Sequence, residues 1–281
     1  MSNKMNKNLK DIFKSSLVGI LAVIISIIPF ERIFGGSSEL FGAMPTIYLL
    51  PIFLIYTSIA FVYSKIKNNL KVSKQGAFFI IFSFNFIISA FLPLIEGEIY
   101  LENFPFLPAL FTEFILSLAI VLLIFYLWKQ DDNREAGQVK SYFASRSVIS
   151  WIWRVIVVML LFYILTMIIG IISMPITGHF LEQGIMKVPS MLTLFSITIS
   201  RSFAYMLVTI PLIIFWKSSK KELFLYLALI ASLIYPILGD TLAPFWPALY
   251  RLVDGTLLTL HTIIMSWLYV KILWKGDLVL N

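Results

Sequence analysis

Cysteine is absent from the 281 residues of this chain, and histidine occurs only at His179 and His261. The lack of cysteine excludes disulfide bonds, thiolate zinc sites and cysteine nucleophiles. Two histidines are too few for a histidine-rich metal site. We therefore expect neither a bound metal nor a cofactor.

Charged side chains are scarce as well. They make up 13% of the residues, whereas 59% are hydrophobic, and the mean hydropathy is +0.92. A soluble domain has about a quarter charged residues and about half apolar ones, while helices surrounded by lipid need apolar side chains on every face. The composition predicts an all-α fold, a polytopic membrane helix bundle whose partner is the lipid bilayer.

The net charge of +7 raises the alternative of a nucleic-acid partner. Seventeen Lys and Arg residues, however, gather in the N-terminal segment, the tail and the loops 64–75, 129–147 and 217–221, while the alternate loops hold only Arg32 and Lys187. The positive-inside rule gives this distribution to a chain in the cell membrane with both termini in the cytoplasm. We therefore expect multi-pass topology and no nucleic acid.

Eight apolar segments are long enough to span a bilayer, since about 20 residues at 1.5 Å each cover its ~30 Å hydrocarbon core. They lie at about 15–34, 44–63, 77–95, 106–128, 148–172, 191–216, 222–239 and 248–271. The first, followed by Gly35-Gly36-Ser37-Ser38, has the alternative of a cleaved signal peptide. We favour a retained helix, because cleavage would leave seven spans and break the alternation of charge.

A short motif occurs twice. PFxPAL followed by an aromatic residue is found at Pro105–Phe111, before the fourth segment, and at Pro244–Tyr250, before the eighth. This echo favours two related four-helix halves, 1–128 and 148–281, and an even number of spans in each half would make them a parallel repeat. Chance similarity is the alternative, because short apolar matches arise easily.

Residues 129–147 join the two halves. Their mixed charges and Gly137 are typical of a solvated linker. The alternative is that Val139–Trp151 forms a short basic, aromatic helix on the membrane surface.

Arg201 is the ionisable residue that most needs a structural account. It lies ten residues into its segment, about 15 Å deep, where an unpaired charge costs about 2.5–3.5 kcal/mol on insertion scales. We expect it to pair with a carboxylate, with Asp254 as the first candidate and Glu113 as the second. The acids Glu96 and Glu98 are expected in an outer loop.

The last segment carries Arg251, Asp254 and His261, spaced by three and seven residues. At 100° per residue they share one helix face. They would form a polar stripe that leads inward from the outer mouth. One interpretation is a structural Arg251–Asp254 pair with a hydrogen-bonded His261, and the other is a proton-responsive site, because histidine titrates near physiological pH.

These five residues, Glu113, Arg201, Arg251, Asp254 and His261, form the predicted charge cluster. No HExxH, GxGD or rhomboid-like dyad is present, so the sequence gives no support for an enzyme. We favour a permease that binds or transports a small solute through a polar site in the outer half. The alternative is a non-catalytic membrane subunit or accessory protein with structural charges. Either function is compatible with a membrane partner or a homo-oligomer.

Overall fold

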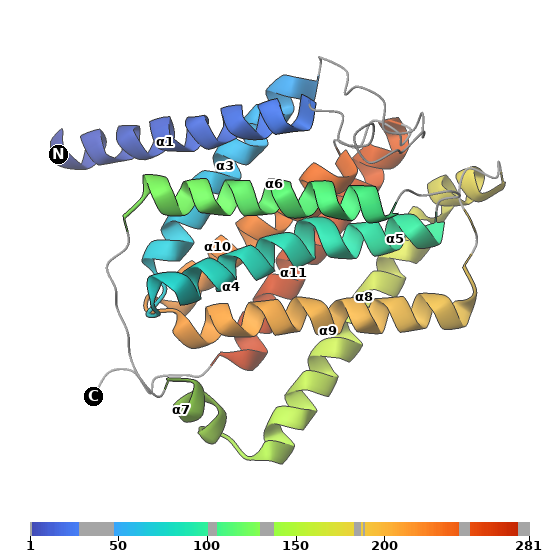
Figure 1. Ribbon diagram of the computed structural model, residues 1–281. Coiled ribbons are helices and arrows are strands. Elements are labelled where there is room, and N and C mark those ends of the chain that lie inside the picture. The colour runs from blue at the N-terminus through green and yellow to red at the C-terminus, as the bar shows by residue number, and fades with distance from the viewer. Residues whose placement is uncertain are drawn as a thin grey trace.

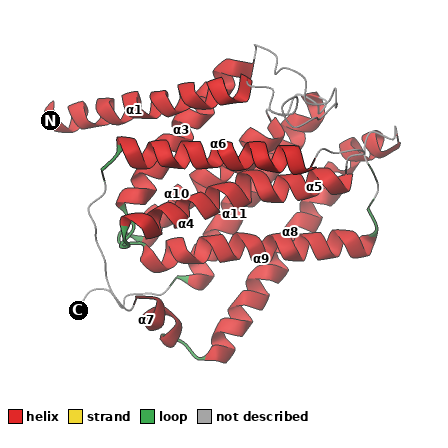
Figure 2. Ribbon diagram, viewed as in Figure 1, coloured by secondary structure: helices red, strands yellow, loops and turns green. Residues whose placement is uncertain are grey.

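The computed structural model describes residues 2–27, 48–100, 106–129, 138–182, 187, 189–241 and 248–274. These residues form an all-α bundle (Figures 1 and 2). In chain order the elements are α1 (Ser2–Ile27), α3 (Leu49–Asn68), α4 (Lys74–Phe86), the π-helix η3 (Ile87–Phe91), α5 (Leu92–Tyr100), α6 (Phe106–Leu127), α7 (Gln138–Ala144), α8 (Val148–Glu182), α9 (Met191–Phe215), α10 (Lys220–Ser232), the π-helix η4 (Leu233–Thr241) and α11 (Ala248–Leu273).

Seven helical stretches among the described residues are long and apolar enough to cross a membrane. They are Leu49–Asn68, Lys74–Tyr100, Phe106–Leu127, Val148–Pro175, Met191–Phe215, Lys220–Leu238 and Arg251–Leu273. The predicted all-α, multi-pass class is confirmed at this level, because these stretches correspond to the second to eighth expected segments. Residues 28–34 of the first segment lie outside the described residues.

The expected ends of two helical segments were wrong, and both lie at the end of the bundle opposite the basic loops. The third stretch continues through η3 and α5 to Tyr100 instead of ending near residue 95. The fifth continues to Glu182 with Pro175 inside the helix. A proline removes one backbone donor, and in lipid a helix retains its remaining backbone bonds because no water can replace them.

The first helix packs along the second. A Cβ built on Gly19 of α1 would lie 2.8 Å from the carbonyl oxygen of Phe53 in α3, too close for any side chain. Small residues permit this backbone approach between membrane helices, where packing replaces the hydrophobic effect as the driving force. The close fit supports a first helix that stays with the bundle.

The loops after α3 and α9 lie side by side. Leu70 and Trp216 form an isolated antiparallel bridge, in which Lys71 N–H donates to the Phe215 carbonyl at 2.8 Å and Lys217 N–H donates to the Asn69 carbonyl at 3.0 Å. We call the end of the bundle that holds this bridge the basic end; it lies at the left in Figure 1.

Helices α4 and α10 follow those loops and share one design. Each has 13 residues, and they begin 146 residues apart. Each begins after a serine N-cap, Ser73 or Ser219, whose hydroxyl accepts a hydrogen bond from the backbone N–H three residues later. Each then passes into a π-helix, and η3 and η4 also begin 146 residues apart.

Helices α6 and α11 also end alike at the basic end. Leu-Trp-Lys occurs at 127–129, where α6 ends at Leu127, and at 273–275, where α11 ends at Leu273. A cation from another helix donates to a carbonyl at each end: Lys14 of α1 binds the Leu127 oxygen at 2.7 Å, and Arg154 of α8 binds the Ile272 oxygen. Last-turn carbonyls have no partner within the helix, so such donors satisfy them.

The helix starts and ends described above align at an offset of 146 residues, and the PFxPAL motif does not follow that offset. Ala109 lies 18 residues before the end of α6, whereas Ala248 lies 25 residues before the end of α11. The difference of seven residues is about 10 Å along a helix. Pro105 and residues 244–247 lie outside the described residues.

Part of the junction 129–147 is helical. The helix α7 is fixed to the end of α11, because the Tyr142 hydroxyl donates to the Leu273 carbonyl at 2.7 Å and Arg146 donates to the Trp274 carbonyl at 2.9 Å. Burial raises the pKa of Tyr142 above its ordinary value, so this hydroxyl remains a donor over a wide pH range. Burial and the nearby Arg154 lower the pKa of Arg146.

Candidate functional site

Arg201 lies in the interior of α9 and is 9% exposed. Its guanidinium forms an ion pair with the carboxylate of Glu96 in α5. The pair lies in the part of the bundle away from the basic end, since Arg201 is ten residues from the start of α9 and 14 from its end. A charge at this depth is stable only when it is paired, and the ion pair meets that requirement.

Tyr235 of η4 completes this cluster. Its hydroxyl donates to the second oxygen of Glu96 at 3.2 Å, and its ring lies under the guanidinium of Arg201 at 4.4 Å from the ring centroid. The carboxylate therefore accepts from two side chains, and the arginine has both an anion and an aromatic face as neighbours. We call Glu96, Arg201 and Tyr235 the Arg201 cluster.

Both π-helices adjoin the cluster. Glu96 follows η3, and Tyr235 lies within η4. A π-turn has an extra residue compared with an α-turn and is frequent at functional sites. The expectation of Glu96 in an outer loop was wrong, because the helix that contains it runs on to Tyr100.

Asp254 belongs to the surroundings of the cluster. The hydroxyl of Tyr100 lies within electrostatic range of Glu96, Arg201 and Asp254. The structure thus places the first expected partner, Asp254, in the same region as Arg201, while the described ion pair of Arg201 is with Glu96.

Arg251 joins the start of α11 to the start of α3. Its guanidinium donates to the Tyr48 hydroxyl at 2.8 Å and lies 5.6 Å from the centroid of that ring. Tyr48 directly precedes α3. This contact holds two spans together near the acid-rich end of the bundle.

His261 is buried between helices. Its Nε2 lies 3.3 Å from the Thr166 hydroxyl of α8, and its ring meets that of Phe162 edge-on at 4.7 Å between centroids. Arg201 lies within electrostatic range of the imidazole. These neighbours agree with a hydrogen-bonded core histidine that borders the Arg201 cluster.

Glu113 lies in α6. It interacts electrostatically with the buried Tyr56 of α3. Of the five predicted residues, Arg201, Asp254 and His261 therefore share one region. Arg251 and Glu113 make their described contacts with Tyr48 and Tyr56.

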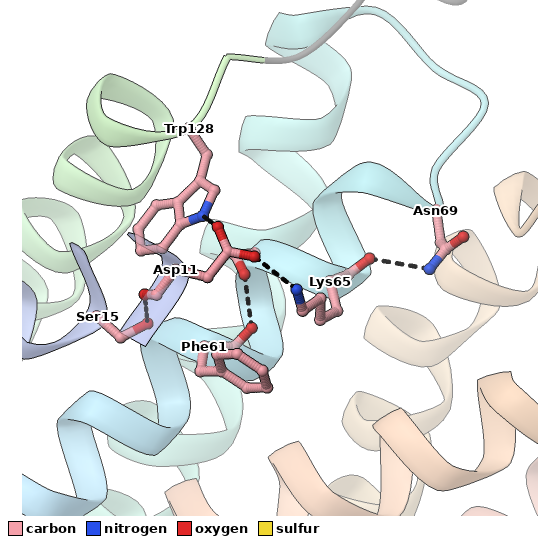
Figure 3. A network of polar contacts seen from close by, with 7 residues as sticks. Asp11, Ser15, Phe61, Lys65, Asn69 and Trp128 are labelled. Carbon is pink, nitrogen blue, oxygen red and sulfur yellow. Dashed lines mark hydrogen bonds and ion pairs between the residues drawn. The ribbon is translucent and has the colours of Figure 1, made fainter. Parts of the chain in front are cut away.

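A second polar network lies at the basic end, and Figure 3 shows its contacts among Asp11, Lys65 and Trp128. Asp11 of α1 accepts from Lys65 of α3 at 2.7 Å and from the Trp128 indole at 2.9 Å. Lys67, which is fully buried, donates to the Trp128 carbonyl. This network joins α1, α3 and the end of α6, so its charges have a structural explanation.

Among the described residues no group of three or more His, Cys, Asp or Glu side chains could hold a metal ion. The chain matches no protein-family model, and no similar curated protein or solved structure was found. The geometry of the site is therefore the basis for a functional proposal.

Sequence reasoning missed three partners: Glu96, Tyr235 and Tyr48. A signal for Glu96 was available, because the residues after Pro93 remain largely apolar up to Tyr100 and allow the helix to continue. Tyrosines gave no signal, since any of the 12 could have been an interface anchor.

Proposed function

We propose that this multi-pass membrane protein is a permease that binds a small solute between two four-helix halves, residues 1–128 and 148–281. The observation that carries the proposal is the ion pair of Glu96 with Arg201. Glu96 belongs to the first half, whereas Arg201 and Tyr235 belong to the second. The pair therefore crosses between the halves.

This placement matches that of the solute site in many transporters. In many transporters the solute site lies between internal repeats, next to interrupted helices, and the halves rock around it. The shared caps, helix lengths and π-helix starts of α4 and α10 support a parallel repeat here. The basic loops favour cytoplasmic termini and a cytoplasmic basic end.

The cluster also favours a class of solute. A solute with a single charge that separated this pair would compensate one side chain and leave the other charge buried without a partner. A zwitterion replaces both partners at once, because its anion binds Arg201 and its cation binds Glu96. We therefore propose a small zwitterionic solute, with the ring of Tyr235 beside its cationic group.

The test is ligand-induced stabilisation of the purified protein. Glycine, acetate and methylammonium share a size range and carry both charges, the negative one or the positive one. A ligand at 100 times its dissociation constant stabilises the folded state by about 2.7 kcal/mol. We expect a larger rise in melting temperature with glycine or another amino acid than with either single ion.

The matched variants are Glu96→Gln and Glu98→Gln, since Glu98 is exposed two residues from Glu96. Glu96→Gln should abolish the rise and Glu98→Gln should retain it. If no zwitterion stabilises the protein, or if Glu96→Gln responds like the wild type, the permease proposal is wrong. That outcome would favour the membrane subunit or accessory protein, for which the mutual neutralisation of Glu96 and Arg201 is purely structural.

A further inference from the structure

One difference between the two halves lies in the core, where large polar side chains of the first half correspond to smaller side chains of the second. The register of 146 residues holds for the starts of α4 and α10 and for the ends of α6 and α11. In the same register, Tyr63 of α3 corresponds to Thr209 of α9, and Asn85 of α4 corresponds to Ala231 of α10.

In the first half, large polar side chains fill this place. The Tyr63 hydroxyl donates to the side-chain oxygen of Asn85 at 3.1 Å, and the Asn85 amide donates to the Ser117 hydroxyl of α6 at 3.0 Å. All three side chains are buried. These hydrogen bonds connect α3, α4 and α6, and each of the three side chains has a hydrogen-bond partner.

In the second half, Thr209 and Ala231 are smaller than their counterparts, and they line a cavity. The opposite wall is α11, which contributes Thr262, Ser266 and Tyr269. In the register of 146 the corresponding residues of α6 are all apolar: Leu116, Ile120 and Leu123. The second half thus has less side-chain volume and more hydroxyl groups at the same location.

The cavity suits water. The centre of a water-sized sphere can occupy about 10 Å³ of it, which is roughly the space for one molecule. Ser202 is fully buried and Tyr269 is 2% exposed, and they lie beside each other. Neither hydroxyl has a hydrogen-bond partner of normal geometry among the described residues. A water in the cavity would give the Tyr269 hydroxyl, which lines it, a hydrogen-bond partner of normal geometry.

The position of the cavity links it to the Arg201 cluster. Ser202 follows Arg201 directly, and the ring of Tyr205, which lines the cavity, meets the ring of Tyr235 edge-on. Thr209 and Ser266 lie further along α9 and α11, both of which end at the basic end. The cavity therefore lies between the Arg201 cluster and the basic end.

We propose that this cavity is the hydrated inner part of the solute path, and that solute leaves the Arg201 cluster towards the basic end through the second half only. The proposal rests on the proposed function. The Tyr63–Asn85–Ser117 network closes the corresponding route in the first half. Transport by the protein is then asymmetric although its framework is duplicated.

The absence of cysteine makes a direct test possible. Ser266→Cys places a thiol in the cavity, and Ser117→Cys is the matched substitution in the closed route, with both serines buried. A small membrane-impermeant thiosulfonate is added to membrane vesicles whose basic end faces outward. Because labelling of a buried group follows the population of opened states, Ser266→Cys should react about tenfold faster or more.

Ala231→Cys serves as the second variant if Ser266→Cys does not fold, since it lines the same cavity. Equal rates for the cavity thiol and Ser117→Cys, or faster labelling of Ser117→Cys, would overturn the proposal. Labelling does not depend on any solute. Fast labelling of Ser266→Cys without stabilisation by zwitterions would therefore leave a hydrated route in the second half and reject only the solute site at the Arg201 cluster.

Discussion

Leu70 and Trp216 lie opposite each other in an antiparallel bridge, Leu70 in the loop between α3 and α4 and Trp216 in the loop between α9 and α10. An antiparallel bridge has a local two-fold axis between its two residues. If the halves are related by two-fold rotation, equivalent loops meet each other in this way. The common register of 146 residues through the following helices extends that relation beyond the bridge.

The serine caps of α4 and α10 should contribute equally to stability. Loss of an N-cap hydroxyl costs about 0.5–2 kcal/mol, so Ser73→Ala and Ser219→Ala should each lower the free energy of unfolding by that amount. Chemical denaturation in detergent measures both. Ser58→Ala is the control, because its exposed hydroxyl bonds only to a carbonyl of its own helix, the Leu54 oxygen. A clear effect at one cap and none at the other would contradict equivalent roles.

The packing of α1 on α3 should depend on Gly19. A methyl group there would meet the Phe53 carbonyl and the Thr57 side chain, so Gly19→Ala should lower the melting temperature in detergent. Overpacking typically costs about 1–3 kcal/mol. The control is Gly170→Ala in α8, where no atom lies within 4 Å of the added group.

At Gly170 alanine should be neutral or stabilising, because it has the higher helix propensity. A Gly19→Ala variant as stable as the wild type would show that α1 does not pack in the described way.

The anchor of α7 should persist at high pH. Tyr142→Phe removes the hydrogen bond to the Leu273 carbonyl and should cost about 0.5–1.5 kcal/mol. Because burial raises the pKa of Tyr142 above the ordinary value of 10.0, its contribution is complete below pH 10 and is lost only as the pH rises through the higher folded-state pKa.

Stability of the wild type and of Tyr142→Phe, measured from pH 6 to pH 10, checks this prediction. The difference between them should stay constant over that window. Tyr126→Phe is the control, since that side chain is 82% exposed. A difference that shrinks well below pH 10 would contradict the raised pKa.

Topology follows from the charge distribution. Reporter fusions after residues 70, 138 and 220 should report cytoplasm, and those after 38, 100 and 183 should report the opposite side. A single inverted pair would reject eight spans with cytoplasmic termini. The N-terminal sequence of the purified protein should begin near Met1, whereas a start near residue 38 would indicate a cleaved signal peptide.

The sequence predicted the spans well because their signal is one of composition. Runs of about 20 apolar residues identified the seven stretches that the described helices confirm. Asn85 and Arg154 were also predictable as a hydrogen bonder between helices and an anchor near the basic end, because polar groups in apolar segments must find partners or reach water.

Partners across the bundle were harder to predict. Glu96 was assigned to an outer loop, although the largely apolar residues after Pro93 allow α5 to continue to Tyr100. Tyr235 bonds Glu96 from a helix 139 residues away in the chain. Such pairings depend on the relative placement of helices, which hydropathy and spacing do not define.

The measurement that tests the account most directly is a double-mutant cycle on Arg201 and Glu96. Removing one partner of a buried ion pair costs about 3–5 kcal/mol, while removing both costs much less than twice that. We predict that Arg201→Ala and Glu96→Ala each destabilise the protein strongly and that the double variant recovers much of the loss. Glu98→Ala, which changes an exposed neighbour, should have little effect alone and no coupling to Arg201→Ala. Additive losses for Arg201 and Glu96, or stronger coupling of Arg201 to Asp254 than to Glu96, would contradict an ion pair that joins the two halves.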